Sequence, residues 1–180
     1  MSAHKVLVVF YSRTGKTEKV ARAMAAGLDA DLDRLIDGRK REGKLGYLSA
    51  FFDGALERRT RLEGKRRDPS QYDLVIIGSP VWNGALSAPV RSYLHEYWSR
   101  LPEVAFFATC GQRGNRALRQ MKELSERDPR AAMELDEDQL ASGAYQEKVA
   151  EFVSCALPTE PPRVREIPVT PSDAIPPPEV

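Results

Sequence analysis

Short runs of consecutive apolar residues alternate along the chain with longer segments in which apolar and polar residues mix. The continuous runs lie in Val6 to Tyr11, Asp73 to Ser79 and Val104 to Thr109. Such runs are typical of strands that are buried on both faces of a parallel sheet. Two weaker segments, Asp31 to Ile36 and Ala131 to Leu135, predict further strands, of which the first is short and more exposed.

The mixed segments show the spacing of amphipathic helices, with apolar residues three or four positions apart. One such segment follows the first strand, carries Val20, Ala21, Met24 and Leu28, and stops near Gly27 and Asp29. The others are centred on residues 47 to 56, 89 to 99, 118 to 124 and 145 to 157. Strands that alternate with helices in this way predict an α/β fold, a doubly wound five-stranded parallel sheet with helices on both faces.

The composition changes near the C-terminus. Of the 13 prolines in the 180 residues, eight lie after Leu157. Proline cannot donate a backbone hydrogen bond, and this segment offers little to bury. The sequence therefore predicts one domain over residues 1–157 and an extended or disordered Pro-rich tail over residues 158–180.

Composition excludes several classes of function. The net charge is +1, so there is no strong attraction to nucleic acid or to an anionic membrane. Neither His4 nor His95 has neighbours at a metal-ligand spacing. Cys110 and Cys155 form no C-x-x-C pair, and neither a signal peptide nor a run long enough to span a membrane is visible. These features predict a cytoplasmic protein with free thiols.

Residues 37 to 68 are unusually basic for a connection between strands. One interpretation is that these charges form the solvated face of a helix and its flanking loops. The other is that they dock an acidic partner or a nicotinamide dinucleotide phosphate. The sequence leaves both open.

The turn between the first strand and the first helix carries the strongest chemical signal. It reads Ser12-Arg13-Thr14-Gly15-Lys16-Thr17 and brings three hydroxyls to a helix N-terminus, where the first N–H groups lack partners. It is not a Walker A loop, because Phe10 stands where that motif needs glycine, and no G-x-G-x-x-G occurs. The turn suits a phosphate monoester, and the alternative is a simple helix cap.

Two further loops follow predicted strands and meet the same sheet edge. The first, Ser79-Pro80-Val81-Trp82-Asn83-Gly84, is so rich in proline and glycine that it predicts irregular structure. The second is Cys110-Gly111-Gln112-Arg113-Gly114-Asn115. Ligands of open α/β sheets bind at this edge, where the strand order reverses. We therefore expect one crevice formed by all three loops.

From about Lys5 to Leu157 the chain resembles the flavodoxin family. The turn at Ser12 is similar to that family's [ST]-x-T-G-x-T phosphate loop, and the segment around Trp82 is similar to its second flavin loop. Residues 108 to 114 occupy the place of the third. The resemblance implies FMN as cofactor and the following contacts: Ser12, Arg13, Thr14, Gly15, Lys16, Thr17, Ser79, Pro80, Val81, Trp82, Asn83, Gly84, Thr109, Cys110 and Gly111.

The resemblance also implies roles. The first loop would hold the ribityl phosphate through hydroxyls and main-chain N–H groups, and Trp82 would lie against the flavin ring and destabilise its reduced form. The alternative for Trp82 is a packing role in the core. The third loop contains no aromatic residue, whereas a typical flavodoxin brings a tyrosine there. A redox role for Cys110 would need a nearby cysteine or histidine, which the loop lacks.

Three functions are consistent with this pattern. The first is a flavodoxin-like electron-transfer protein that exchanges electrons with a partner protein. The second is an FMN-dependent NAD(P)H oxidoreductase acting on a quinone or similar small acceptor. The third is a flavin-free binding module that recruits partners through its tail. The near-neutral charge and the bare third loop favour an enzyme slightly, but no substrate acid or base stands out in the sequence.

Overall fold

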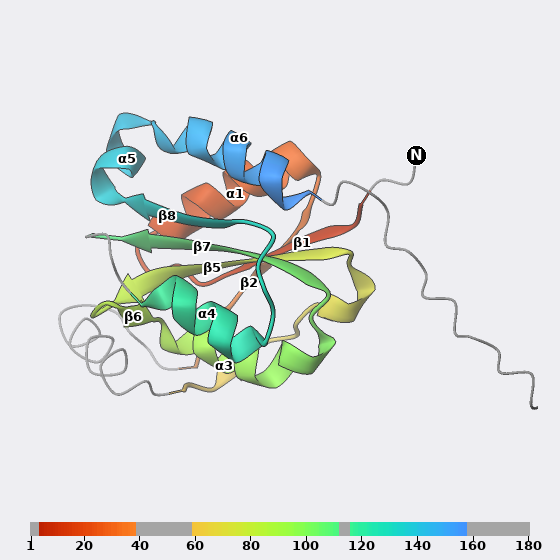
Figure 1. Ribbon diagram of the computed structural model, residues 1–180. Coiled ribbons are helices and arrows are strands. Elements are labelled where there is room, and N and C mark those ends of the chain that lie inside the picture. The colour runs from red at the N-terminus through yellow and green to blue at the C-terminus, as the bar shows by residue number, and fades with distance from the viewer. Residues whose placement is uncertain (1–3, 39–58, 112–115, 158–180) are drawn as a thin grey trace, which may run out of the picture.

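The apolar runs of the sequence form the centre of a sheet in the computed structural model, which describes residues 4–38, 59–111 and 116–157 (Figure 1). Five strands are parallel, in the spatial order β2-β1-β5-β7-β8. The predicted doubly wound α/β fold is therefore confirmed. The parallel strands are β1 (Val6–Phe10), β2 (Asp31–Arg34), β5 (Leu74–Trp82), β7 (Glu103–Cys110) and β8 (Ala132–Asp136).

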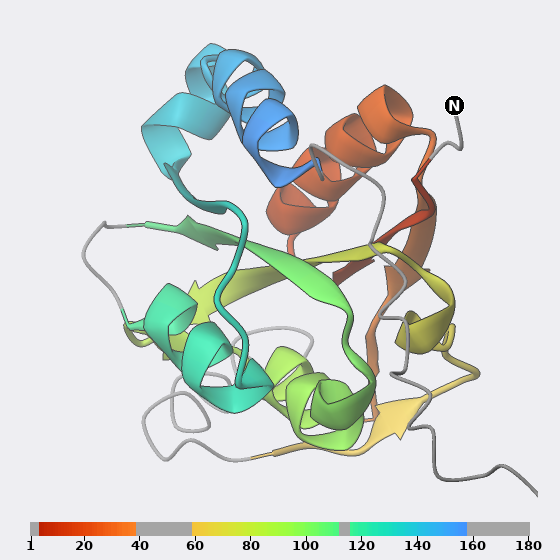
Figure 2. The same ribbon diagram turned by 45° about the vertical axis from the view of Figure 1, so that its right-hand side comes forward.

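Helices cover both faces of the sheet (Figures 1 and 2). One face carries α1 (Lys16–Leu28), α5 (Glu137–Ser142) and α6 (Tyr145–Ala156), and the other carries α3 (Ala88–Tyr97) and α4 (Ala117–Ser125). Because successive strand residues point to opposite faces, Leu7 and Val9 join one hydrophobic cluster while Val8 and Phe10 join the other. Each helical layer is thus held by its own buried cluster.

Segment 31–36 was expected to be one short strand, which is confirmed for Asp31–Arg34 as β2 but is wrong for the last two residues. The chain leaves the sheet after Arg34, and buried Leu35 packs into the cluster beneath α3. The next two residues form β3 (Ile36–Asp37), which pairs antiparallel with β4 (Leu62–Glu63) in a separate small sheet. Two short 3₁₀ turns, η1 (Pro69–Gln71) and η2 (Trp98–Arg100), complete the described elements.

The segment from Ser79 to Gly84 was expected to be irregular, and it is not. Strand β5 continues to Trp82 and turns back into β6 (Ala85–Leu86), which pairs antiparallel with it. Asn83 and Gly84 form the two-residue turn, with φ of 48° and 70°. Two positive φ values in succession are those of a type I′ hairpin turn, for which Asn-Gly is a preferred sequence.

Gly78 lies within β5, and a packing requirement explains why this position is a glycine. A Cβ atom at Gly78 would lie 2.0 Å from Cζ of Phe107, on the neighbouring strand β7. The absence of a side chain at Gly78 therefore makes room for the buried Phe107 ring.

Two of the arginines in the basic segment pair with carboxylates of β2. The guanidinium of Arg66 pairs with Asp33 at 3.2 Å, and both side chains are 7% exposed. Arg67 pairs with Asp31 at 3.2 Å and its backbone N–H donates to Asp33. These contacts fasten residues 66 and 67 to the edge strand β2, so these two arginines serve as structural anchors.

Several expectations fall on residues outside the described ranges. They are the helix at 47–56, the loop residues 112–115 and the tail from 158, so the domain boundary at 157 stays a prediction. Within the described parts of the chain, no helix combines the length and the apolar character required to cross a membrane.

Candidate functional site

A cleft of about 400 Å³ opens at the carboxyl ends of β1, β5 and β7. It lies where the strand order reverses, because β2 is on one side of β1 and β5 is on the other. All three expected loops contribute to it, as does one helix that the sequence did not predict. Its lining residues are Arg13, Thr14, Lys16, Thr17, Pro80, Val81, Trp82, Asn83, Thr109, Cys110, Gly111, Glu137 and Leu140.

The first wall is the turn between β1 and α1. The N-cap residue of α1 is Gly15, with φ of 86°, and no side chain caps the helix from that position. The hydroxyl of Ser12 instead accepts a hydrogen bond from the Gly15 N–H at 3.1 Å. The alternative that the turn is only a helix cap does not describe it. The N-cap residue is a glycine, and the Ser12 hydroxyl bonds within the loop that precedes the helix.

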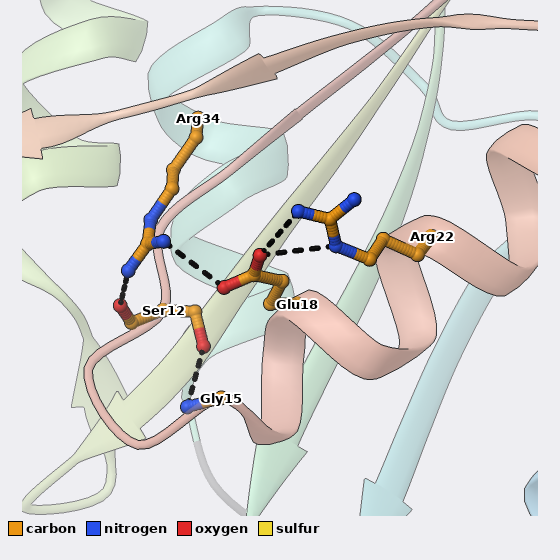
Figure 3. A network of polar contacts seen from close by, with 5 residues as sticks. All are labelled: Ser12, Gly15, Glu18, Arg22 and Arg34. Carbon is orange, nitrogen blue, oxygen red and sulfur yellow. Dashed lines mark hydrogen bonds and ion pairs between the residues drawn. The ribbon is translucent and has the colours of Figure 1, made fainter.

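A network of charged side chains holds this turn in place (Figure 3). Arg34, the last residue of β2, donates to the Ser12 carbonyl at 3.3 Å and pairs with Glu18 at 3.1 Å. Arg22, one turn further along α1, pairs with the same Glu18 carboxylate at 2.8 Å. Two arginines therefore offset the negative charge of Glu18 in the first turn of the helix, and Arg34 connects the turn to the edge of the sheet.

Two hydroxyls meet inside the cleft. Oγ1 of Thr17 lies 2.8 Å from Oγ1 of Thr109, and the two residues are 1% and 5% exposed. Thr14 is exposed at the tip of the turn. The Lys16 ammonium donates to Glu137 Oε1 at 2.7 Å, so its charge is paired with a carboxylate on the cleft wall.

The second wall is the β5–β6 hairpin, which carries Trp82. This side chain is 6% exposed and meets the ring of Tyr11 edge to face, with centroids 5.5 Å apart and planes at 89°. Trp82 belongs to the hydrophobic cluster on the α3 and α4 side, and it also lines the cleft. The structure thus shows the packing role that was the alternative for Trp82, together with a position at the site.

Buried polar contacts fix the hairpin against the helices. Gln120 of α4 accepts a hydrogen bond from the Leu86 N–H at 2.8 Å, and Arg91 of α3 donates to the Leu86 carbonyl at 3.2 Å. The Arg116 N–H donates to the Gly84 carbonyl at the hairpin tip, also at 2.8 Å. The hairpin that carries Trp82 is therefore held in place by hydrogen bonds from α3, from α4 and from Arg116.

Four of the expected contact residues do not line the cleft. Ser12 and Gly15 shape the first turn, and Gly84 forms the tip of the hairpin. Ser79 is fully buried, and its hydroxyl lies 2.8 Å from both the Pro80 carbonyl and the Ser87 hydroxyl. These four residues support the walls of the cleft.

Cys110 ends β7 and lines the cleft, and it is 6% exposed. Its thiol donates to Glu134 Oε1 at 3.3 Å. The other cysteine, Cys155, is exposed on α6, and neither cysteine forms a disulfide bond within the described ranges. No group of three or more metal-ligating side chains is found in the described ranges 4–38, 59–111 and 116–157.

Sequence reasoning missed Glu137 and Leu140, which belong to α5. This short helix directly follows β8 and begins with a capping box, in which Asp136 accepts from the Gln139 N–H and Gln139 accepts from the Asp136 N–H. An Asp with Gln three residues later, after a predicted strand, is the signal that could have revealed the helix.

Comparison with known proteins identifies the family of this chain. Residues 5–155 match the family model described as flavodoxin. The chain therefore belongs to the flavodoxin family. The sequence matches no curated protein.

Solved structures agree with this assignment. A flavoprotein from Lactobacillus acidophilus NCFM, determined in complex with FMN, is 23% identical with a TM-score of 0.64, covering 79% of this chain and 99% of its own. The two-electron reduced flavodoxin of Megasphaera elsdenii is 18% identical with a TM-score of 0.55, covering 84% and 99%. Rubredoxin oxygen:oxidoreductase from Desulfovibrio gigas is 16% identical with a TM-score of 0.57, covering 84% and 35%. At these identities the likeness establishes the fold.

Proposed function

We propose that this protein is a flavodoxin-like electron-transfer protein that binds FMN in the cleft at the carboxyl ends of β1, β5 and β7. The observation that carries the proposal is the composition of that cleft. Hydroxyls at a helix N-terminus lie in the same cavity as a hairpin that carries a tryptophan. A ligand that joins a phosphate to a flat aromatic ring system needs both hydrogen-bond donors for the phosphate and an apolar surface for the ring.

The residues of the first wall fit a phosphate monoester. Thr14 and Thr17 offer hydroxyl donors, and the start of α1 has no capping side chain from Gly15. Arg13 also lines the cleft, whereas the charge of Lys16 is already paired with Glu137. The phosphate would therefore be held mainly by hydroxyls and by the positive end of the helix dipole.

The residues of the hairpin fit the ring. Pro80, Val81 and Trp82 supply apolar surface, and Asn83 adds a polar group at the turn. When bound, FMN supplies one- and two-electron transfer. The protein positions the ring, excludes water with the apolar wall and donates hydrogen bonds from the hairpin backbone. The FMN complex of the L. acidophilus flavoprotein, which has the same fold, supports this cofactor.

Titration of the purified protein with FMN, followed by quenching of flavin fluorescence, tests the proposal. We expect Thr14→Ala to weaken FMN binding by roughly 1 to 3 kcal/mol, because a hydrogen bond to a charged group is lost. Ser99→Ala, which removes an exposed hydroxyl from η2, is the matched control and should bind like the wild type. A protein without FMN affinity would support the flavin-free binding module instead.

A second candidate is an FMN-dependent NAD(P)H oxidoreductase. The observation that favours it is the absence of aromatic residues from positions 109 to 116, so that this loop has no aromatic side chain to stack on the ring. Anaerobic mixing of the FMN-loaded protein with NADPH separates the two candidates. Bleaching of the flavin within minutes would support the oxidoreductase, and an unchanged flavin spectrum would support the carrier with a partner protein.

A further inference from the structure

The buried contact between Thr17 and Thr109 joins two loops that lie far apart in the sequence. Thr17 is the second residue of α1, and Thr109 is the penultimate residue of β7. Their Oγ1 atoms are 2.8 Å apart, and both residues line the cleft. The contact therefore lies at the place where the proposed phosphate would bind.

The direction of this hydrogen bond follows from the ligand. A threonine hydroxyl has one proton to donate and lone pairs to accept with, whereas a phosphate dianion can only accept. If Thr17 gives its proton to the phosphate, then its oxygen must accept the proton of Thr109. We propose that Thr109 is a positioning residue that donates to Thr17 Oγ1 and so aims the Thr17 proton at the phosphate of FMN. This inference rests on the proposed function.

Thr17 needs such a partner. A threonine hydroxyl can point in more than one direction, because the side chain has several staggered rotamers and the hydroxyl proton can rotate. A bond from Thr109 favours the single rotamer that faces the cleft. The pairing of Lys16 with Glu137 makes the hydroxyl more important, since that ammonium is engaged with a carboxylate.

Thr109 is well placed to act as a fixed donor. It lies within the sheet, where its strand pairs with β5 at Pro80 and with β8 at Leu135. A donor that is held by strands on both sides keeps its position more rigidly than a loop residue would. The carboxyl end of β7, where Thr109 lies, thus contributes to the proposed phosphate site through Thr17.

The test compares Thr109→Val with Thr109→Ser in titrations of the full-length protein with FMN and with riboflavin, which lacks the phosphate. Valine keeps the branched shape and removes the hydroxyl, whereas serine keeps the hydroxyl. We expect Thr109→Val to weaken FMN binding on the order of five- to tenfold and to weaken riboflavin binding far less, because riboflavin has no phosphate for Thr17 to bind. Thr109→Ser should bind both ligands like the wild type.

A double-mutant cycle with Thr17→Val tests whether Thr109 acts through Thr17. We expect the double variant to bind FMN no more weakly than Thr17→Val alone. Additive losses, an unchanged FMN affinity in Thr109→Val, or equal losses for FMN and riboflavin would each overturn the inference and leave the proposed function standing. A wild-type protein that does not bind FMN would overturn the proposed function itself.

Discussion

Tyr93 places a phenol hydroxyl in the core beneath the sheet. The side chain is fully buried, and its oxygen has no hydrogen-bond partner among the residues that the structure describes. Burial raises the pKa of Tyr93, and the negative charge of Asp33 raises it further. Tyr93 therefore stays neutral in the folded protein, at the cost of an unsatisfied polar group.

We expect Tyr93→Phe to stabilise the protein by about 1 kcal/mol, because the unpartnered hydroxyl is removed while the ring can keep its stacking on Tyr97. Tyr72→Phe is the matched control. The Tyr72 hydroxyl donates to Asp31 at 2.7 Å, so its loss should destabilise the protein by a similar amount. Urea unfolding of both variants measures the two changes, and a destabilised Tyr93→Phe would show that the hydroxyl is bonded, for instance to a buried water.

The same variant should alter stability at alkaline pH. The pKa of Tyr93 is higher in the folded than in the unfolded protein, so its neutral form favours folding below the unfolded pKa of about 10. That contribution is lost as the pH rises above this value, because the unfolded chain then gains by ionising. Tyr93→Phe should therefore lose less stability than the wild type in unfolding measurements above about pH 10.

Single residues were predictable from sequence where a local motif carries the information. The turn around Thr14 and Thr17 was found in this way, and both residues line the cleft. Glu137 and Leu140 were not found, because they reach the cleft through the packing of a helix more than a hundred residues later. The packing of Trp82 against Tyr11 is likewise a tertiary contact, which no local sequence pattern predicts.

At the scale of elements, a buried side chain from α4 helps to hold the β5–β6 hairpin in place. Gln120 accepts the Leu86 N–H in a buried position. We expect Gln120→Leu to destabilise the protein by roughly 1 to 3 kcal/mol, because this N–H would lose its acceptor. FMN affinity should fall as well, since the hairpin carries Trp82. Arg119→Leu, at an exposed position of the same helix, is the control.

Urea unfolding and flavin titration measure both effects. The control variant should stay within about 0.5 kcal/mol of the wild type. If Gln120→Leu kept its stability and lost FMN affinity, the hairpin would be supported by other contacts and Gln120 would act on the cleft alone. If neither changed, the hairpin would not depend on Gln120.

The hairpin is also where element prediction was wrong, for a physical reason. Gly78 and Pro80 indicate a loop when each is considered alone, but Gly78 accommodates the Phe107 ring. Pairing of β1 with β5 ends at Gly78, so a residue without an N–H is tolerated beyond it. The Asn83-Gly84 pair carried the correct signal for a tight hairpin.

At the scale of the whole molecule, alternation of strand and helix was enough to predict the fold. The three central strands β1, β5 and β7 contain continuous apolar runs, and the predicted helices each have one apolar face, so the layers follow from the pattern. Strand β2 departs from this rule, since its buried Asp33 is paired with Arg66. An ion pair between residues 33 positions apart leaves no local trace in the sequence.

Both hydrophobic clusters are formed by described residues between Val6 and Ala156. We therefore expect deletion of residues 158–180 to leave the thermal unfolding temperature and the FMN affinity unchanged. Truncation after residue 148 is the contrasting variant, because it removes Val149, Phe152 and Ala156 from the core. Thermal unfolding followed by circular dichroism measures both, and a large loss of stability on removing the tail alone would contradict the expectation.

The cleft has a consequence for the order of events during biosynthesis. Its first lining residue is Arg13 and its last is Leu140, so its walls come from segments synthesised at very different times. A nascent chain on the ribosome has the phosphate turn early, but it lacks the wall of α5 until Leu140 has been synthesised. High-affinity loading of the proposed cofactor therefore has to wait until α5 has been synthesised and has packed against the cleft.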